Sequence, residues 1–320
     1  GVAGSIDGSS ATITVGRTGG GETSNIGVKD THGNFDRWRN AFGAYRVIPL
    51  ANANIHLSNS KAIVRSGKLK GAYGAVAWAS GGTALVEDNS VEVSGGVFTG
   101  TDGCAVAGGF ARVEDNGPQA VAVARRNHAT ITGGSFDGRY LQGGYAFIND
   151  SGTIFADATA EGNTLTITGG SYSVSADDII TVAGGAAYTE ALDINSTAAV
   201  TDSTASVTGG SFTAETKLYG GNAETESDAR SEAKALRNSL TFTTGDTVAE
   251  IYGGRVYANP TKTSISLQAN ENHLTAKAGA DKFYGGYAHG EQQAGATRVS
   301  LNTAETNGNI VKIEAGSGTF

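Results

Sequence analysis

The strongest constraint on the fold is a ten-residue cassette that returns along the whole chain. Its clearest copy runs from Asn127 to Phe136 and reads Asn-His-Ala-Thr-Ile-Thr-Gly-Gly-Ser-Phe. Close copies start at Asn89, Asn163 and Ser203. Weaker copies start at Ser9, Ala53, Asn238, Asn272 and Asn309. Successive starts lie 34 to 44 residues apart, with most near 36. Self-similarity at a period of this size predicts a repeat architecture, in which each repeat packs only on its neighbours.

Each repeat divides into three short extended stretches. The cassette alternates apolar and polar residues, as in Leu165-Thr-Ile167, and a period of two indicates a strand with one buried face. The second stretch is an aromatic-Gly-Gly element with eight copies, for example Tyr219-Gly-Gly-Asn-Ala223. The third stretch precedes the next cassette, as in Ala120-Val-Ala-Val123. Three strands and three corners per repeat predict one turn of a β-helix.

The predicted fold class is therefore all-β, a parallel β-helix (β-solenoid) of about eight turns, with roughly 36 residues and three short strands per turn. Residues 1–320 form one domain. Within it, 1–8 are a partial turn, 9–308 hold the repeats, an insertion lies near 17–41, and 309–320 begin another turn. A propeller is the alternative, but Trp38 and Trp78 occupy no repeated position of the kind that propeller blades show. Residues 224–237 place Ala229, Ala233 and Leu236 at helical spacing, which indicates a short outer helix or a loop.

Stacking in register brings equivalent residues of successive turns together. The cassette asparagines are predicted to form a hydrogen-bonded ladder at a corner, because amide side chains can bond above and below. The predicted ladder consists of Asn89, Asn127, Asn163, Asn238, Asn272 and Asn309. The last cassette position predicts an aromatic column, made of Phe98, Phe136, Tyr172 and Phe212. The Gly-Gly pair between them is predicted to turn a corner.

The insertion near 17–41 is the one region that departs from the repeat. It contains Arg37, Trp38 and Arg39, where a tryptophan is flanked by two arginines. Such a group can cover the open end of a β-helix, and it can also contact a ligand. The sequence is compatible with both a cap on the β-helix end and a ligand contact.

No cofactor, metal or catalytic site is predicted. The five histidines share no metal-ligand spacing, and no glycine-rich loop precedes a helix. Many β-helices cleave polysaccharides with acidic residues on neighbouring turns of one face. The candidate acids occupy different phases of the repeat, so stacking does not unite them: Asp177, Asp178, Asp202, Asp228 and Asp246.

Composition excludes several further classes. The 48 glycines arrive in pairs once per repeat and are accompanied by only 3 prolines, which excludes collagen. With 23 basic and 31 acidic residues the net charge is −8, and no basic cluster suits nucleic acid. No apolar run approaches the length of a transmembrane helix. The single cysteine, Cys104, is expected to be structural. The absence of methionine and the start at Gly1 suggest a processed piece of a longer precursor.

The alternation of Asn-x-Val-x-Ile-x-Gly-Gly with elements such as Tyr284-Gly-Gly-Tyr-Ala288 resembles a known group of repeats. These are the β-helical passenger regions of autotransporter-like and adhesin-like surface proteins of bacteria. The resemblance extends from about Ser9 to Ala315. It implies export and display at the bacterial cell surface, in an extracellular setting.

Both ends carry incomplete turns, which predicts head-to-tail self-association, because an open β-helix end exposes unpaired backbone groups. The residues expected at such a contact are Gly1, Val2, Ile6, Ile13, Val15, Ile310, Val311, Ile313 and Phe320. An arbitrary boundary within a longer solenoid explains the ends equally well.

Three hypotheses of function follow. The first is a structural, extracellular subunit that stacks head-to-tail into a surface fibre or stalk. The second is a monomeric adhesin passenger whose outer loops bind host or cell-surface glycans or proteins. The third is a polysaccharide lyase or hydrolase, which the scattered acids support least.

Overall fold

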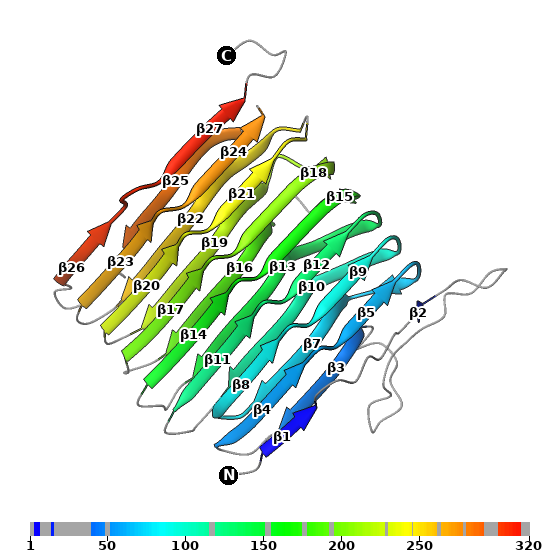
Figure 1. Cartoon of the computed structure of the whole chain (residues 1–320), viewed down its shortest axis with the longest axis horizontal. Helices are drawn as coiled ribbons and strands as arrows, with labels where there is room; N and C mark the ends of the chain where they lie inside the picture. The colour runs from blue at the N-terminus through cyan, green and yellow to red at the C-terminus, as the bar shows by residue number, and fades with distance from the viewer. Residues whose placement is uncertain are drawn as a thin grey trace.

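The computed structural model of the chain is a parallel β-solenoid, as the repeat predicts (Figure 1). It describes residues 3–6, 14–15, 40–48, 52–114, 119–150, 155–174, 178–191, 195–227, 230–244, 246–260, 264–277, 280–290 and 300–314. Within these ranges every regular element is a strand. Each strand pairs in parallel with its equivalent from the neighbouring repeat, so the propeller alternative is wrong.

Each turn contributes one strand to each of three faces, named here A, B and C. Face A is a nine-stranded sheet of the described residues: β1 (Ala3–Ile6), β4 (Ala53–Ser58), β8 (Gly82–Glu87), β11 (Ala120–Arg125), β14 (Phe155–Glu161), β17 (Asn195–Thr201), β20 (Arg230–Leu236), β23 (Ser264–Asn270) and β26 (Ser300–Glu305). Face B carries the cassette strands: β2 (Thr14–Val15), β5 (Lys61–Val64), β9 (Ser90–Val93), β12 (His128–Ile131), β15 (Thr164–Tyr172), β18 (Thr204–Phe212), β21 (Ser239–Phe242), β24 (His273–Lys277) and β27 (Ile310–Glu314).

Face C carries the aromatic-Gly-Gly strands: β3 (Asn40–Ile48), β7 (Gly71–Ala79), β10 (Val97–Glu114), β13 (Ser135–Asp150), β16 (Ile180–Ala191), β19 (Thr216–Ser227), β22 (Val248–Pro260) and β25 (Ala280–Gly290). The short strand β6 (Lys68–Leu69) pairs with the start of β10. Faces B and C join into one sheet, because β13 pairs with β15 of face B and with β16 of face C.

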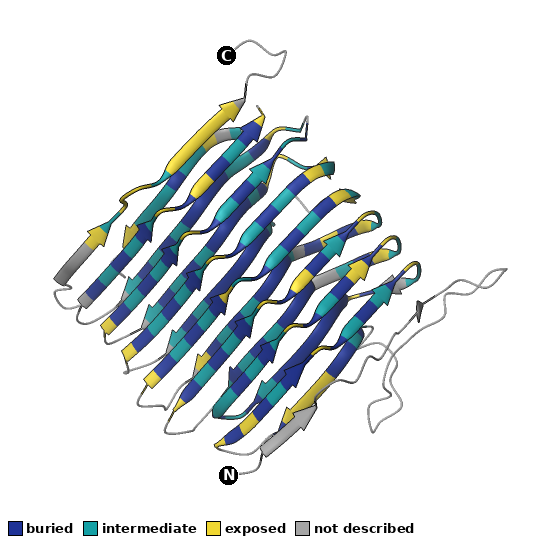
Figure 2. Cartoon of the chain, in the orientation of Figure 1, coloured by how far each residue is buried: buried dark blue, intermediate teal, exposed yellow. Residues whose placement is uncertain are grey.

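The buried apolar residues of the interior form two main clusters. Figure 2 shows buried segments alternating with more exposed ones along the strands. Face A packs on the C-terminal halves of the face C strands in an alanine-rich cluster that includes Ala122, Ala158 and Ala146. Face B packs on the N-terminal halves in a bulkier cluster that includes Leu165 and Leu141.

The asparagine ladder lies at the corner between faces A and B. Asn127 donates from Nδ2 to the carbonyl of Val86 at 3.1 Å and to Oδ1 of Asn163 at 3.1 Å. Its own Oδ1 accepts from the backbone N–H of Asn89 at 3.1 Å and from Nδ2 of Asn89 at 3.0 Å. Asn238, Asn272 and Asn309 repeat this pattern. Every rung thus satisfies buried polar groups that would otherwise be costly.

Ser203 interrupts the ladder between Asn163 and Asn238. The backbone N–H of Asn163 reaches Oγ of Ser203 at 3.4 Å, a long contact, and Oγ donates to the carbonyl of Thr201 at 3.2 Å. The shorter side chain supplies one oxygen where asparagine supplies a full amide. This rung is therefore the weakest of the described ladder.

The paired glycines of face C let this face approach the ladder. A Cβ atom on Gly144 would lie 2.2 Å from Oδ1 of Asn163, and one on Gly143 would lie 2.3 Å from the carbonyl oxygen of Gly184. Any larger side chain would push the two layers apart. The pair is thus required by close packing across the solenoid, in addition to any turn that it makes.

The cassette aromatics form the predicted column. Ring centroids are 4.6 Å apart for Phe98 and Phe136, 4.9 Å for Phe136 and Tyr172, and 4.4 Å for Tyr172 and Phe212. The glycine two residues before each ring has a positive φ, for example 118° at Gly134, and it turns the corner as predicted.

The helix or loop expected for residues 224–237 is wrong. The chain there forms the end of β19 and all of β20. Ser231, Ala233 and Ala235 are buried and alternate with more exposed residues, so the period of two prevails over the helical spacing.

Candidate binding face

The outward side of face C carries three columns of side chains, with one residue per turn in each. Column 1 consists of Phe42, Tyr73, Ala107, Gln142, Ala183, Tyr219, Tyr252 and Tyr284. Column 2 consists of Tyr45, Val76, Phe110, Tyr145, Ala186, Asn222, Arg255 and Tyr287. Column 3 consists of Val47, Trp78, Arg112, Phe147, Tyr188, Glu224, Tyr257 and His289. Aromatic residues are therefore concentrated on this one face.

The rings in these columns stack from turn to turn. In column 1 the centroids of Tyr219 and Tyr252 are 5.0 Å apart, and the planes differ by 11°. In column 2 the ring centroids of Phe110 and Tyr145 are 5.0 Å apart. In column 3 those of Phe147 and Tyr188 are 5.3 Å apart. Because the spacing follows the strand separation, each ring occupies one layer of the solenoid. In this packing the rings of Tyr219 and Tyr252 are buried, whereas those of Tyr145 and Tyr287 are partly exposed and contribute apolar area to the surface.

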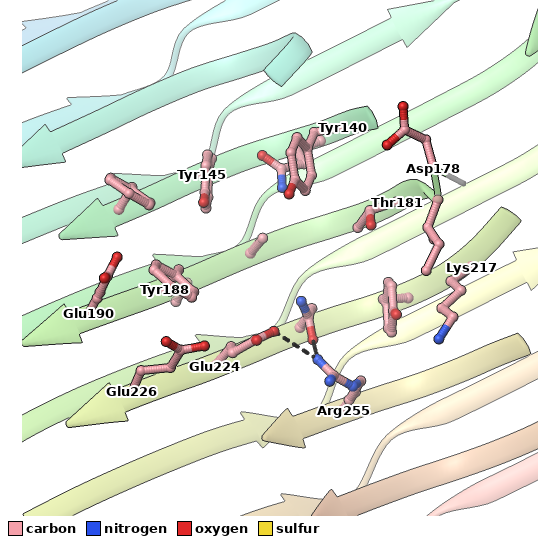
Figure 3. A pocket seen from close by; sticks show the side chains of 17 residues that line it. Tyr140, Tyr145, Asp178, Thr181, Tyr188, Glu190, Lys217, Glu224, Glu226 and Arg255 are labelled. Atoms are coloured by element: carbon pink, nitrogen blue, oxygen red, sulfur yellow. Dashed lines mark hydrogen bonds and ion pairs between the residues drawn. The ribbon is translucent and has the colours of Figure 1, made fainter. Parts of the chain in front are cut away.

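Each of the two columns lacks a ring on several strands, but among the described strands of face C only β16 lacks a ring in both column 1 and column 2. Ala183 and Ala186 stand there, in register with Tyr219 and Tyr145 of the adjacent strands. A hollow of about 640 Å³ opens at this place, and Ala186 is one of the residues that line it. Figure 3 shows larger side chains of the lining, among them Tyr145, Tyr188 and Arg255. Ala186 occupies a position that carries a ring in several other turns and lines the hollow, whereas Ala183 is fully buried beside it.

A charged network borders the hollow on β19 and β22. Arg255 donates to Oδ1 of Asn222 at 2.8 Å and to Oε2 of Glu224 at 3.0 Å (Figure 3). Its guanidinium also lies 5.0 Å from the ring centre of Tyr257 and 5.9 Å from that of Tyr219. These contacts fix the side chain at the edge of the hollow.

Carboxylates gather at another edge of the hollow. Glu190 on β16 is paired in register with Glu226 on β19, and Glu224 is two residues away on the same strand. Burial, together with the charges of Glu224 and Glu190, raises the pKa of Glu226. Burial likewise raises the pKa of the Tyr188 hydroxyl, which hydrogen-bonds Glu226. A carboxyl group with a raised pKa is a candidate acid, although structural clusters shift pKa values too.

The pKa of Glu250, which lies on β22 two residues before Tyr252 of column 1, is shifted in the opposite direction. Burial alone would raise its pKa, but hydrogen bonds from Tyr252, Lys282 and Lys217 lower the pKa to about 2. The two lysines lie 3.0 Å from the carboxylate oxygens. This side chain is ionised and paired, so it stabilises the face and is a poor proton donor.

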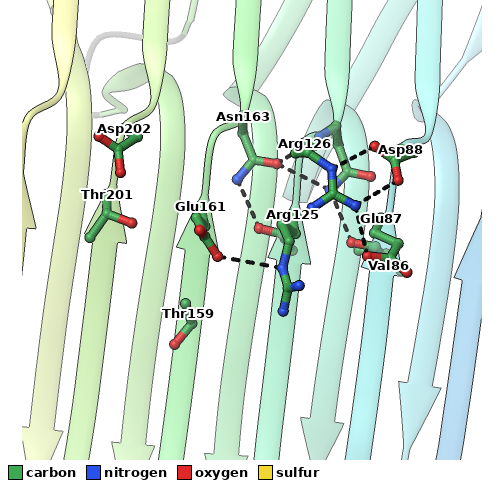
Figure 4. Close-up of polar contacts among 12 residues, drawn as sticks. Val86, Glu87, Asp88, Arg125, Arg126, Thr159, Glu161, Asn163, Thr201 and Asp202 are labelled. Carbon is green, nitrogen blue, oxygen red and sulfur yellow. Dashed lines mark hydrogen bonds and ion pairs between the residues drawn. The ribbon is translucent and has the colours of Figure 1, made fainter.

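The three candidate acids that the structure describes make different contacts. Asp178 lines the hollow. Asp202 lies at the ladder corner, where Arg237 bonds both of its oxygens at 2.8 Å. Arg126 makes the equivalent pair with Asp88, as Figure 4 shows. Asp246 accepts a hydrogen bond from the backbone N–H of Phe212 at 3.0 Å.

Several other predicted residues fall outside the described ranges. These are Asp177, Asp228, Arg37, Trp38 and Arg39, together with Gly1, Val2, Ile13 and Phe320. Ile6 and Val15 lie in β1 and β2, whose backbones pair with β4 and β5. Ile310, Val311 and Ile313 lie in β27 and are 52, 43 and 40% exposed. The head-to-tail contact therefore stays a prediction.

Among the described residues, no cluster of three or more histidine, cysteine or acidic side chains is arranged to hold a metal ion. His128 and His273 are exposed on face B, as their position after the ladder asparagine predicts. The described part of the chain also contains no helix with the length and apolar character needed to cross a membrane.

The hollow was not among the sites predicted from the sequence. The signal lies in the aromatic-Gly-Gly elements, because the element with Ala183 and Ala186 is the one of the eight that has no ring at either outward position. A comparison of the eight elements column by column would have located the gap. No protein-family model, curated protein or solved structure matches the chain.

Proposed function

We propose that the chain is a non-catalytic surface module that binds an extended glycan along the outward side of face C. The observation that carries this proposal is the set of stacked aromatic columns, interrupted at β16 by the hollow. The proposal adopts the adhesin hypothesis and moves the binding region from the outer loops to a strand face. An extracellular, bacterial cell-surface location and host or cell-surface glycans as partners belong to the same proposal.

The shape and chemistry of face C support this choice. A flat parallel sheet presents its side chains at a constant spacing of about 4.8 Å per turn. An extended polymer with a short repeat can therefore contact equivalent positions on successive turns. Sugar rings have apolar C–H faces and polar rims, which match aromatic surfaces edged by carboxylate, amide and guanidinium groups such as Glu224, Asn222 and Arg255.

The test is electrophoresis of the full chain through gels that contain soluble cellulose derivatives, mannan, xylan, chitosan or pectate. Retardation by at least one polysaccharide is expected, and Tyr145→Ala should reduce it because this change removes a partly exposed ring of column 2 that lines the hollow. Thr166→Ala on face B, opposite to the columns, is the matched control. Migration unaffected by all five polysaccharides contradicts the proposal.

The same samples separate binding from catalysis. Release of reducing ends that is lost in Glu226→Gln would favour the polysaccharide lyase or hydrolase hypothesis, since Glu226 has the raised pKa expected of an acid. Retardation without release of reducing ends is the result that the binding proposal expects.

Head-to-tail assembly is a second candidate function, favoured by β27. In the described residues β27 pairs with β24, and Ile310, Val311 and Ile313 are unusually exposed for apolar strand residues. A stacked copy would cover them, and so would a further turn of a longer chain. Electron microscopy of the purified chain should show fibres, and monodisperse short rods at high concentration would contradict assembly.

A further inference from the structure

We propose that the hollow over β16 is a subsite for a single pyranose ring from a neutral or amino-bearing glycan. This inference rests on the proposed function, because it identifies the ligand class for one place on the same face. Its basis is the register of the outer columns, the volume of the hollow and the charges at its edge.

The hollow has room for a sugar ring at the one layer that lacks a ring in both columns. Where rings follow one another within column 1 or column 2, their centres are 4.8 to 5.5 Å apart, which is one layer per turn. On β16 that layer has no ring, and Ala186 lies in register between Tyr145 on β13 and Asn222 on β19. A ring supplied by a ligand restores the layer and covers the apolar side chain of Ala186.

The edge of the hollow fits a guest with a polar rim. Arg255 is held by Asn222 and Glu224, so the donors and acceptors are in place before a ligand arrives. Thr181, from β16, adds a hydroxyl group to the lining. A purely apolar guest would desolvate these groups without replacing their hydrogen bonds to water. The hydroxyl groups of a sugar provide those bonds, which favours a pyranose over an aromatic guest.

The charge at the edge selects among sugars. Four carboxylates line the hollow, from Asp178, Glu190, Glu224 and Glu226, against two cationic side chains. Acidic groups therefore outnumber the basic groups, which are Lys217 and Arg255. A uronic acid or sulfated ring would meet like charge in a partly desolvated place, whereas a neutral hexose would not and an amino sugar would be attracted.

The test fills the hollow with an aromatic side chain of the protein itself. Ala186→Tyr places in the hollow the residue that column 2 carries at positions 45, 145 and 287, so the strand is expected to accept it. Thr166→Tyr adds the same ring to the outward side of face B and serves as the matched control. Asn222→Ala is a second variant, which weakens the edge without adding bulk. Circular dichroism and thermal unfolding establish that each variant is folded.

Isothermal titration calorimetry of the full chain uses cellohexaose, mannohexaose, the glucosamine hexamer and hexagalacturonate as probes. We expect a neutral or amino hexamer to bind, hexagalacturonate to bind at least about tenfold more weakly, and Ala186→Tyr to lose at least about tenfold in affinity, or about 1.4 kcal/mol. Asn222→Ala should lose severalfold, and Thr166→Tyr should bind as the unaltered chain does.

The results distinguish a wrong subsite from a wrong ligand class and from a wrong proposed function. If a hexamer binds and Ala186→Tyr binds it equally well, the subsite is wrong while glycan binding by face C stands. If hexagalacturonate binds as tightly as the neutral hexamers, the assignment of ligand class is wrong. If none of the four probes binds the unaltered chain, both the subsite and the proposed function are overturned.

Discussion

Replacing one ladder asparagine should cost the chain far more stability than replacing the serine of the interrupted rung. In Asn127→Ala four side-chain hydrogen bonds disappear, which link Asn127 to Asn89, Val86 and Asn163. At about 1 kcal/mol net for each bond, the expected loss is about 4 kcal/mol. The buried N–H of Asn89 is also left without its acceptor, which adds to the cost.

The matched change is Ser203→Ala. It removes one bond at 3.2 Å and one long contact at 3.4 Å, so the expected loss is about 1 kcal/mol. Both positions are fully buried and occupy the same corner of the solenoid. The difference of about 3 kcal/mol between them therefore measures the amide ladder rather than burial.

Urea denaturation followed by far-ultraviolet circular dichroism measures both costs. The midpoint should fall much further for Asn127→Ala than for Ser203→Ala, with similar slopes, because the area exposed on unfolding is nearly the same. Equal midpoints for the two variants would refute the argument that the ladder amides stabilise the corner.

Three further predictions follow from the same contacts. Ser203→Asn should complete the ladder and raise the stability by about 1 kcal/mol in the same urea assay, and a lower midpoint would contradict this. Gly144→Ala should lower the free energy of unfolding by about 3 kcal/mol, because its Cβ would lie 2.2 Å from Oδ1 of Asn163. Gly162→Asn is the control: Gly162 has a φ of 61°, which asparagine tolerates, so the free energy of unfolding should change by less than about 0.5 kcal/mol. The pKa of Glu250 is lowered to about 2, so its contribution to stability is present above the unfolded-state pKa and is lost as the pH falls from about 5 to 2. Glu250→Gln should therefore make the stability depend less on pH in that range, and an unchanged pH profile would count against the pairing of Glu250 with the lysines.

The sequence predicted the features that depend only on equivalent positions in successive turns. The ladder at Asn127 and the column at Phe136 are examples, because stacking in register gives the same residue the same neighbours in each layer. The positive φ at Gly134 was predictable for the same reason.

Features that depend on the cross-section of the solenoid were not predictable in this way. The close approach of Gly144 to Asn163 joins two faces whose packing the repeat does not specify. The strand β20 was missed, because Ala229, Ala233 and Leu236 fit a helical period in the sequence. The strand is evident only from the structure, where buried residues such as Ser231 and Ala233 alternate with more exposed ones. The hollow at Ala186 was missed, because it lies where rings are absent, which a search for reactive residues does not detect.

The central claim, that the gap in the aromatic columns receives a sugar ring, is tested most directly by saturation-transfer difference NMR. Irradiation of the aromatic protons of the full chain should transfer saturation to the C–H protons of cellohexaose, mannohexaose or the glucosamine hexamer. We expect this transfer for the unaltered chain and its loss in Ala186→Tyr, in which the protein itself occupies the gap. No transfer to any of these probes, or equal transfer with the gap filled, would contradict the claim.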